Sequence, residues 1–401
     1  MDEAEFVVNY NQFVSDYNLA RLITVYTSIL QYQKSIKKRT VMTILHKLLM
    51  AFIIAIAMLF TSCSTDDDNN TASINYSTAE NLLTDINFQG YAIITKNGND
   101  LVRQGFGLAN ENTALPQDYQ LAYRIGSVSK TLTAAAIIQL KRDGYISNYN
   151  QTLNEFDPEF PNGNQISIAQ LLSHQSGIPD YQFVVEDAAA QGSFFDEEDI
   201  YEVISELITE NGLNFTPGAS KQYSNSNYLI AALLIQELTQ MPYHDYIQQN
   251  IFNPLEMNST FKGIDDINQN THAEGYNNGN ANSVYPMNLA FGAGDFSSSP
   301  KDMEIWTNAV KTNWFSATEK EDIFAQDVPS GYVDFGLGWF TTQEGNTTLY
   351  WHGGDINGYW SMIGFIPEYD ATIVLLSNKQ DDTGTQRNTI IEQLLTNEFN
   401  Q

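Results

Sequence analysis

The chain has 401 residues, of which 42% are hydrophobic, and its 48 acidic and 19 basic side chains give a formal net charge of −29. This length and apolar content suffice for a sizeable core in one large domain or two. The charge argues against electrostatic binding to nucleic-acid phosphates or anionic lipid headgroups, and we interpret it as favouring solubility.

Cysteine and histidine give no indication of a metal site. Cys63 is the only cysteine, which excludes an intramolecular disulfide and a cysteine-based zinc site. The five histidines are scattered and form no His-x-x-x-His pair: His46, His174, His244, His272 and His352. We therefore expect neither a metal nor a cofactor.

The N-terminal region has the pattern of an export signal. The thirteen apolar residues from Leu48 to Phe60 are too few for a membrane span but fit the apolar part of a secretory signal. Small residues precede Cys63 and an acidic stretch follows it, which resembles a bacterial lipoprotein signal, although Phe60 stands where an aliphatic residue is usual. The resemblance implies a cleaved signal over 42–62, lipid on Cys63 and a disordered acidic linker over 63–73. An uncleaved membrane anchor is the alternative.

Either alternative places the rest of the chain outside the cytoplasm. We expect a lipid-anchored protein of the cell envelope, attached to the outer membrane and facing the periplasm or the cell surface. Because such signals begin within a few residues of the chain start, Met42 is the more natural first residue. Residues 1–41 are then an unassigned extension from a misplaced start.

A β-hairpin opens the globular part, and a helix with a serine and a lysine follows. The apolar runs Tyr91–Thr95 and Leu101–Gly107 flank an Asn-Gly turn, which predicts the hairpin. The helix begins at or just before Ser127 and ends near Gly144, a residue suited to a helix C-terminus. Ser127 and Lys130 lie three apart on one face, so the amine can activate the hydroxyl where backbone N–H groups are unpaired. Taken alone, this spacing also fits an ordinary solvated helix start.

The remaining chain predicts helices and then strands. Residues 145 to about 270 are mostly helical, and the last third contains short β-type runs and a closing helix: Phe335–Phe340, Thr347–Trp351, Tyr359–Ile366, Ala371–Leu376 and the helix Thr385–Phe399. We expect an α+β fold in which one antiparallel sheet is built from both chain ends and flanked by helices, with a mostly helical second lobe. A cleft between lobes is a usual place for a site.

Two further stretches hold polar side chains beside turns. Tyr223 and Asn225 are two apart, so they point the same way in extended backbone, although they also fit turn residues before a helix. The stretch His352–Asp355 contains paired glycines, which let another chain or a substrate approach the backbone.

Four stretches occur in an order and at separations typical of one enzyme superfamily: Ile125–Thr131, Leu171–Pro179, Tyr223–Asn225 and His352–Gly354. They resemble the serine β-lactamase and penicillin-binding-protein superfamily. The similarity is greatest to its class C-like branch, which includes D-Ala-D-Ala carboxypeptidases, D-amino-acid peptidases and esterases. Secondary matches are Ile251–Leu255, Gly292–Gly294 and Phe335–Trp339. We assign residues 74–401 to one β-lactamase-like serine hydrolase domain.

The resemblance implies a role for each matching residue. Ser127 would be the acylated nucleophile, and Lys130 would share its proton network. Tyr223 would act as general base toward Ser127 and as acid toward the leaving group, if nearby Lys130 keeps it partly ionised. Asn225 would position Lys130 and the acyl side of the substrate. The backbone N–H groups of Ser127 and Asp355 would form the oxyanion hole.

Two residues depart from the family pattern. His352 stands where β-lactamases usually carry a lysine that binds a substrate carboxylate, and histidine is mostly neutral at pH 7. Asp355 adds negative charge where a small hydroxyl residue is common. Both weaken the case for an anionic β-lactam or D-Ala terminus, whereas esterase and peptidase relatives carry His-x-Gly here. We expect His174 to hold a loop, and His244 and His272 to lie at the surface.

We predict an exported serine hydrolase that forms an acyl-enzyme on Ser127 and cleaves an ester or a D-amino-acid-containing peptide. The catalytic residues are Ser127, Lys130 and Tyr223, and the substrate and oxyanion contacts are Asn225, His352, Gly353, Gly354 and Asp355. Two alternatives stay open: a β-lactamase or D-Ala-D-Ala carboxypeptidase acting on cell-wall peptide, and a non-catalytic peptide-binding module on the same fold. We expect a monomer that contacts its substrate and, through lipid on Cys63, the membrane, but no nucleic acid.

Overall fold

A computed structural model describes residues 78–264, 271–277, 279–281, 285–324, 333–380 and 385–399. The expected signal, lipidation site and linker (42–73) lie outside these residues, as does the extension 1–41. Among the described residues, every helix is too short or too polar to span a bilayer. By their internal contacts these residues form two units. Helix α5 (Gln182–Ala190), within residues 182–195, is separate from the unit described below.

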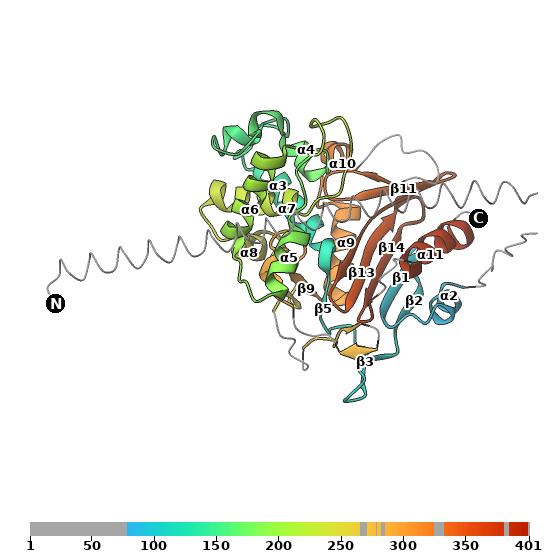
Figure 1. Cartoon of the computed structure of the whole chain (residues 1–401). Coiled ribbons are helices and arrows are strands. Elements are labelled where there is room, and N and C mark those ends of the chain that lie inside the picture. The colour runs from blue at the N-terminus through green and yellow to red at the C-terminus, as the bar shows by residue number, and fades with distance from the viewer. Residues whose placement is uncertain are drawn as a thin grey trace, which may run out of the picture. The chain divides into compact units, whose positions relative to one another are not determined.

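The larger unit is built on a seven-stranded antiparallel sheet in the order β10-β11-β12-β13-β14-β1-β2 (Figure 1). Its strands are β1 (Gly90–Lys96), β2 (Asn99–Phe106), β10 (Val333–Phe335), β11 (Phe340–Glu344), β12 (Thr347–Ile356), β13 (Tyr359–Ile366) and β14 (Ala371–Ser377). Strand β1 pairs with β14, so the sheet is built from both ends of the domain as predicted. The predicted hairpin joins β1 to β2 through Asn97 and Gly98, which both have the positive φ that such a turn needs.

The unit also contains smaller sheets. In these, β3 (Leu108–Asn110) pairs with β4 (Leu115–Pro116), β5 (Tyr123–Arg124) and β6 (Thr260–Lys262) pair with β9 (Phe296–Ser298), and β7 (Tyr276–Asn277) pairs with β8 (Asn280–Ala281). The helices of this unit are α2 (Ala79–Asp85), α3 (Ser129–Arg142), α4 (Ile168–Leu172), α6 (Glu197–Asn211), α7 (Ser226–Thr239), α8 (Tyr243–Ile247), α9 (Pro300–Thr312), α10 (Ala317–Ile323) and α11 (Thr385–Gln393). The predicted α+β fold, with a helical middle, is confirmed.

Side chains of β12 alternate between two environments. Leu349 and Trp351 belong to an apolar cluster shared with Ile390 on α11, and α2 and α11 lie along this side of the sheet (Figure 1). Because successive strand residues point to opposite faces, His352 and Gly354 lie on the other face. Helix α9 packs against β13 and β14. The alternation therefore directs His352 and Gly354 toward the helical part of the unit.

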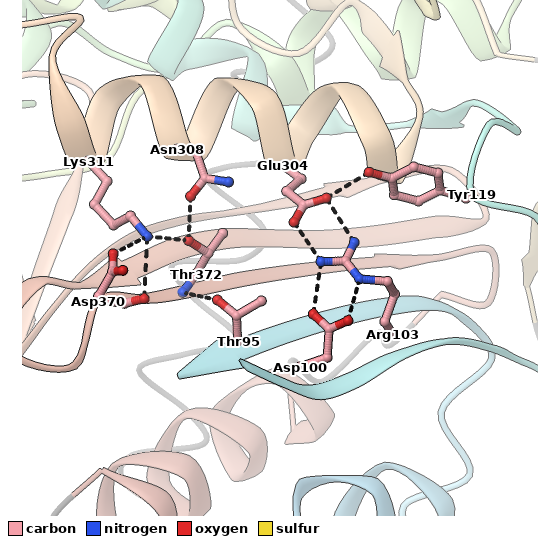
Figure 2. Close-up of polar contacts among 9 residues, drawn as sticks. All are labelled: Thr95, Asp100, Arg103, Tyr119, Glu304, Asn308, Lys311, Asp370 and Thr372. Atoms are coloured by element: carbon pink, nitrogen blue, oxygen red, sulfur yellow. Dashed lines mark hydrogen bonds and ion pairs between the residues drawn. The ribbon is translucent and has the colours of Figure 1, made fainter. Parts of the chain in front are cut away.

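Ion pairs fasten α9 to the sheet (Figure 2). Arg103 on β2 binds Glu304 on α9 through Nη2 and Oε1 at 2.8 Å, and binds Asp100 through Nε and Oδ2 at 2.8 Å. Farther along the helix, Lys311 pairs with Asp370 at 2.7 Å. Side chains from α9 thus contact both β2 and the turn that precedes β14.

Two sequence predictions are wrong. The run Phe335–Phe340 is not one strand: Phe335 ends β10, Phe340 begins β11, and residues 336–339 form the turn between them, in which Gly338 has a φ of +81°. His272 and His244 are not surface residues. His272 is buried, and His244 is half-buried with Nε2 at 2.6 Å from Oδ2 of the buried Asp295.

Candidate active site

Ser127 lies in a short 3-10 turn, η1 (Gly126–Val128), that leads directly into α3. The predicted helix start is therefore correct to within two residues. Gly126 has a φ of +49°, and a Cβ there would lie 3.0 Å from the backbone nitrogen of Asp355. Ser127 keeps part of its surface exposed, whereas its neighbours in the turn are buried. The turn thus presents one reachable hydroxyl at the start of a buried helix.

Lys130 is fully buried, and its amine contacts three oxygen atoms. Nζ lies 3.0 Å from Ser127 Oγ, 2.8 Å from Asn225 Oδ1 and 2.7 Å from the carbonyl oxygen of Ala293. Burial lowers the pKa of Lys130 to about 7, although the carboxylate of Asp180 acts in the opposite direction. A substantial share of the amine is consequently neutral near pH 7 and able to accept a proton.

Tyr223 contacts the same hydroxyl, since its phenol is hydrogen-bonded to Ser127. Its ring stacks on His174 with centroids 4.3 Å apart, and Lys130 Nζ lies 5.0 Å from the ring centroid. Burial raises the pKa of Tyr223 well above its ordinary value, more than the hydrogen bond from Ser127 lowers it. The phenol therefore stays protonated, which disagrees with the expectation that Lys130 keeps it partly ionised.

Asn225 is held in one orientation by a carboxylate. Its backbone N–H and its Nδ2 both donate to Asp180 Oδ2, each at 3.0 Å, which turns Oδ1 toward Lys130. The backbone of Asn225 is helical rather than extended, because it directly precedes α7. Sequence reasoning gave Asp180 no role. Its position just after the matching stretch Leu171–Pro179 was the available signal.

His174 supports the segment that carries Tyr223. Its Nδ1 accepts a hydrogen bond from the backbone N–H of Ser224 at 3.2 Å, and its carbonyl oxygen accepts from Gln222 N–H at 2.9 Å. Burial lowers the pKa of His174 well below its ordinary value, so the ring is neutral. The predicted loop-holding role is confirmed.

Strand β12 forms one wall of the site and touches η1 backbone to backbone. A Cβ on Gly354 would collide with the carbonyl oxygen of Ile125 and lie 2.9 Å from Ser127 N. Ser361 on β13 fixes this contact, because its hydroxyl donates to the Ile125 carbonyl oxygen at 2.7 Å. The backbone of η1 and that of β12 near Asp355 are thereby held in close contact, and Gly126 and Gly354 make this possible.

His352 contributes no charge to this wall. It is 1% exposed, stacks on Phe340 with ring centroids 4.3 Å apart, and donates from Nδ1 to the Gly353 carbonyl oxygen at 2.7 Å. Burial, and next the charge of Lys130, lower the pKa of His352 to about 3. The ring is neutral at physiological pH, as its residue type indicated.

Asp355 is paired with a cation that sequence reasoning missed. Its Oδ2 lies 2.8 Å from Nη2 of Arg387 on α11. The negative charge expected from Asp355 is therefore offset within the structure. Arg387 gave no sequence signal, because the pattern of the closing helix did not say which of its residues meets β12.

Residues 78–397 match the family model named Beta-lactamase. The chain belongs to this family. It is accordingly a serine hydrolase in general terms, and the site around Ser127 lies within the matched residues. Among the described residues, no group of three or more His, Cys, Asp or Glu side chains is arranged to hold a metal ion.

Several known proteins are similar to this chain. PbpX of Bacillus subtilis (strain 168) is 28% identical over 326 residues, which cover 79% of this chain and 78% of PbpX. Protein flp of Staphylococcus aureus (strain MRSA252) is 28% identical over 306 residues, which cover 71% of this chain and 58% of flp.

Solved structures share the fold. D-amino acid amidase from Ochrobactrum anthropi SV3, complexed with L-phenylalanine, has a TM-score of 0.68 at 21% identity, covering 80% of this chain and 98% of the amidase. A penicillin-binding protein from Bacillus halodurans has a TM-score of 0.66 at 20% identity, covering 80% and 99%.

Proposed function

We propose that this protein hydrolyses an ester or a D-amino-acid amide or peptide through an acyl-enzyme on Ser127. The contact that carries the proposal is the 3.0 Å distance from the buried amine of Lys130 to Ser127 Oγ. A serine hydroxyl needs a nearby base before it can attack a carbonyl, and burial provides one by lowering the pKa of Lys130 to about 7.

In the acylation step, neutral Lys130 takes the proton of Ser127 as Oγ attacks the substrate carbonyl. The negative charge that develops on the carbonyl oxygen is stabilised by the backbone N–H groups of Ser127 and Asp355. Asn225, oriented by Asp180, keeps the amine pointed at the hydroxyl. Lys130 is therefore a better candidate for the base than Tyr223.

Tyr223 is suited to the second half of the step. Its phenol is protonated and hydrogen-bonded to Ser127, so it can donate a proton to the leaving alkoxide or amine. It then regains a proton from Lys130. In deacylation, water attacks the ester carbonyl on Ser127, and the proton transfers of the acylation step run in reverse. The acid is released and the free hydroxyl of Ser127 is restored.

The charge of the β12 wall supports the substrate class. His352 is neutral, and the charges of Asp355 and Arg387 are paired with each other. No uncompensated cation on this wall, within the described residues, awaits a carboxylate such as that of a β-lactam. A neutral ester or amide fits better, and the similarity to a D-amino acid amidase agrees with an amide substrate.

A substrate panel tests this proposal. It compares p-nitrophenyl esters, D- and L-amino-acid amides and a chromogenic cephalosporin, with Ser127→Ala as the control. We expect Ser127-dependent turnover of an ester or a D-amino-acid amide and little turnover of the cephalosporin. Preferred hydrolysis of the cephalosporin would favour the β-lactamase alternative. Absence of any turnover, with peptidoglycan binding that survives in Ser127→Ala, would favour the binding module.

We also propose that the chain acts at the cell envelope. The support is the short apolar stretch before Cys63, which resembles a lipoprotein signal. Growth with a labelled fatty acid should label the protein, and Cys63→Ala should abolish the label. Labelling that persists without Cys63 would contradict the proposal.

A further inference from the structure

We propose that Asp355 sets the charge preference of the site, because its carboxylate occupies the Arg387 guanidinium and so excludes substrates with a carboxylate at strand β12. This inference rests on the proposed hydrolase function. Asp355 is then the side chain that makes the enzyme prefer substrates without a carboxylate at this position.

Arg387 packs on Gly353 from the α11 side of strand β12, the face opposite to that of His352 and Gly354. A Cβ on Gly353 would lie 2.9 Å from its Nε and 3.0 Å from its Cζ, so the guanidinium covers that glycine. Gly353 lies between His352 and Gly354 in the sequence, and Gly354 is the residue that faces Ser127. Burial dominates the pKa shifts of Tyr223 and His352, and the charge of Arg387 makes a small further contribution that lowers both pKa values. A cation therefore lies behind the segment of β12 along which a substrate would lie.

The ion pair between Asp355 and Arg387 uses only part of the guanidinium. Only Oδ2 and Nη2 are in contact, at 2.8 Å, whereas carboxylates often bind arginine through two parallel hydrogen bonds. Nη1 of Arg387 is buried and lacks a hydrogen-bond partner among the described residues. The Asp355 side chain is 46% exposed and that of Arg387 only 15%, so Asp355 is the more accessible member of the pair.

An acidic substrate meets two obstacles at this point. Its carboxylate approaches the like charge of Asp355, and the charge of the cation that would attract it is already offset by Asp355. Removing the charge of Asp355 removes the first obstacle and releases Arg387 for the substrate. The competing explanation is that the pair only clamps α11 to β12. A clamp affects stability but gives no preference between charged and neutral substrates.

Two thioesters form a matched pair of probes. Both carry the acyl group with the highest rate in the substrate panel, and their leaving groups are thioglycolate, which has a carboxylate, and thioglycolamide, which does not. The measured quantity is the ratio of kcat/KM for the charged thioester to that for the neutral one. Because both probes use the same oxyanion hole, the ratio cancels any effect of a substitution on the backbone N–H of Asp355.

We expect the ratio to rise at least tenfold in Asp355→Asn, mainly through a lower KM for the charged thioester. The double variant Asp355→Asn/Arg387→Gln should lose this gain. In Arg387→Gln alone, Asp355 stays charged and unpaired, so the ratio should fall below the wild-type value and recover partly in high salt. Circular dichroism establishes whether each variant is folded. If Asp355→Asn does not fold, the kcat/KM ratio measured for Arg387→Gln alone tests the inference.

An unchanged ratio in Asp355→Asn, or a gain that persists in the double variant, would overturn the inference. An unchanged ratio in Arg387→Gln would do the same. These outcomes leave the proposed hydrolase function intact, because they are measured on active enzyme. If the wild type cleaves no substrate of the panel and neither thioester, the proposed function itself has failed.

Discussion

Burial determines which of the two side chains touching Ser127 changes its charge near neutral pH. An ammonium and a phenolate are both disfavoured by a low dielectric, so burial moves the pKa of Lys130 down and that of Tyr223 up. The amine becomes a base at neutral pH, and the phenol remains an acid. Burial alone therefore makes Lys130 suited to act as the base and Tyr223 as the acid.

The activity should therefore depend on the protonation of Lys130. We predict that kcat/KM rises with pH through an apparent pKa near 7, because only the neutral amine accepts the Ser127 proton. His174 and His352 do not explain such a rise, since burial lowers both of their pKa values. The measurement is the pH profile between about pH 5.5 and 8.5, and a flat profile would contradict the prediction.

Asp180→Asn provides the matched control. Its amide oxygen still accepts from Asn225, but the negative charge that raises the pKa of Lys130 is gone. The rising limb should move to lower pH by roughly half a unit, whereas Asp180→Ala should also lower the plateau about tenfold by releasing Asn225. A limb that moves to higher pH in Asp180→Asn would show that another group is titrating.

At the scale of elements, the contact between η1 and β12 aligns the two backbone N–H groups of the proposed oxyanion hole. A Cβ at position 354 meets the backbone of Ile125, whereas the nearest atoms to one at position 353 belong to the Arg387 side chain, which can move. We predict that Gly354→Ala lowers kcat about a hundredfold or more and Gly353→Ala much less, since losing one oxyanion donor costs this much. Equal losses in two folded variants would show that the contact is not required.

The ion pairs that fasten α9 to the sheet give a prediction about stability. Arg103 binds two carboxylates: that of Glu304, which is 15% exposed and also accepts from Tyr119, and that of Asp100, which is 48% exposed (Figure 2). Glu304→Gln should lower the free energy of unfolding by about 1–3 kcal/mol, and Asp100→Asn by about 0.5 kcal/mol or less. Urea denaturation measures both values. A larger loss in Asp100→Asn would refute the ranking.

The sequence was sufficient for the elements with a strong local signal and insufficient for contacts set by the packing of distant segments. The Asn97-Gly98 hairpin and the strand Tyr359–Ile366 were predicted correctly from turn residues and apolar patterning. The motifs around Ser127 and Tyr223 identified residues that the fold brings together. The pairing of Arg387 with Asp355 and the raised pKa of Tyr223 were not predicted, because both arise from burial and from contacts between distant segments.

At the scale of the whole molecule, burying Lys130 links stability to pH. Its folded-state pKa is about 7 and its ordinary value is 10.5, so between these values the unfolded chain binds a proton that the folded protein does not. The free energy of unfolding therefore rises with pH between these two pKa values. Below the lower one, the amine is charged in both states, and the protein bears the full loss of stability from burying that charge. We predict that the wild type gains stability relative to Lys130→Met from about pH 7 to 9, measured by urea denaturation. A constant difference would contradict this.

The central claim is that Ser127 is a nucleophile activated by Lys130, and covalent labelling tests it most directly. The wild type is treated with a fluorophosphonate and examined by intact-mass and peptide mass spectrometry, alongside Ser127→Ala. The account predicts one phosphonyl adduct, located on Ser127, that forms faster as the pH rises through about 7 and is absent from Ser127→Ala. An adduct on another residue, or equal labelling of Ser127→Ala, would contradict it.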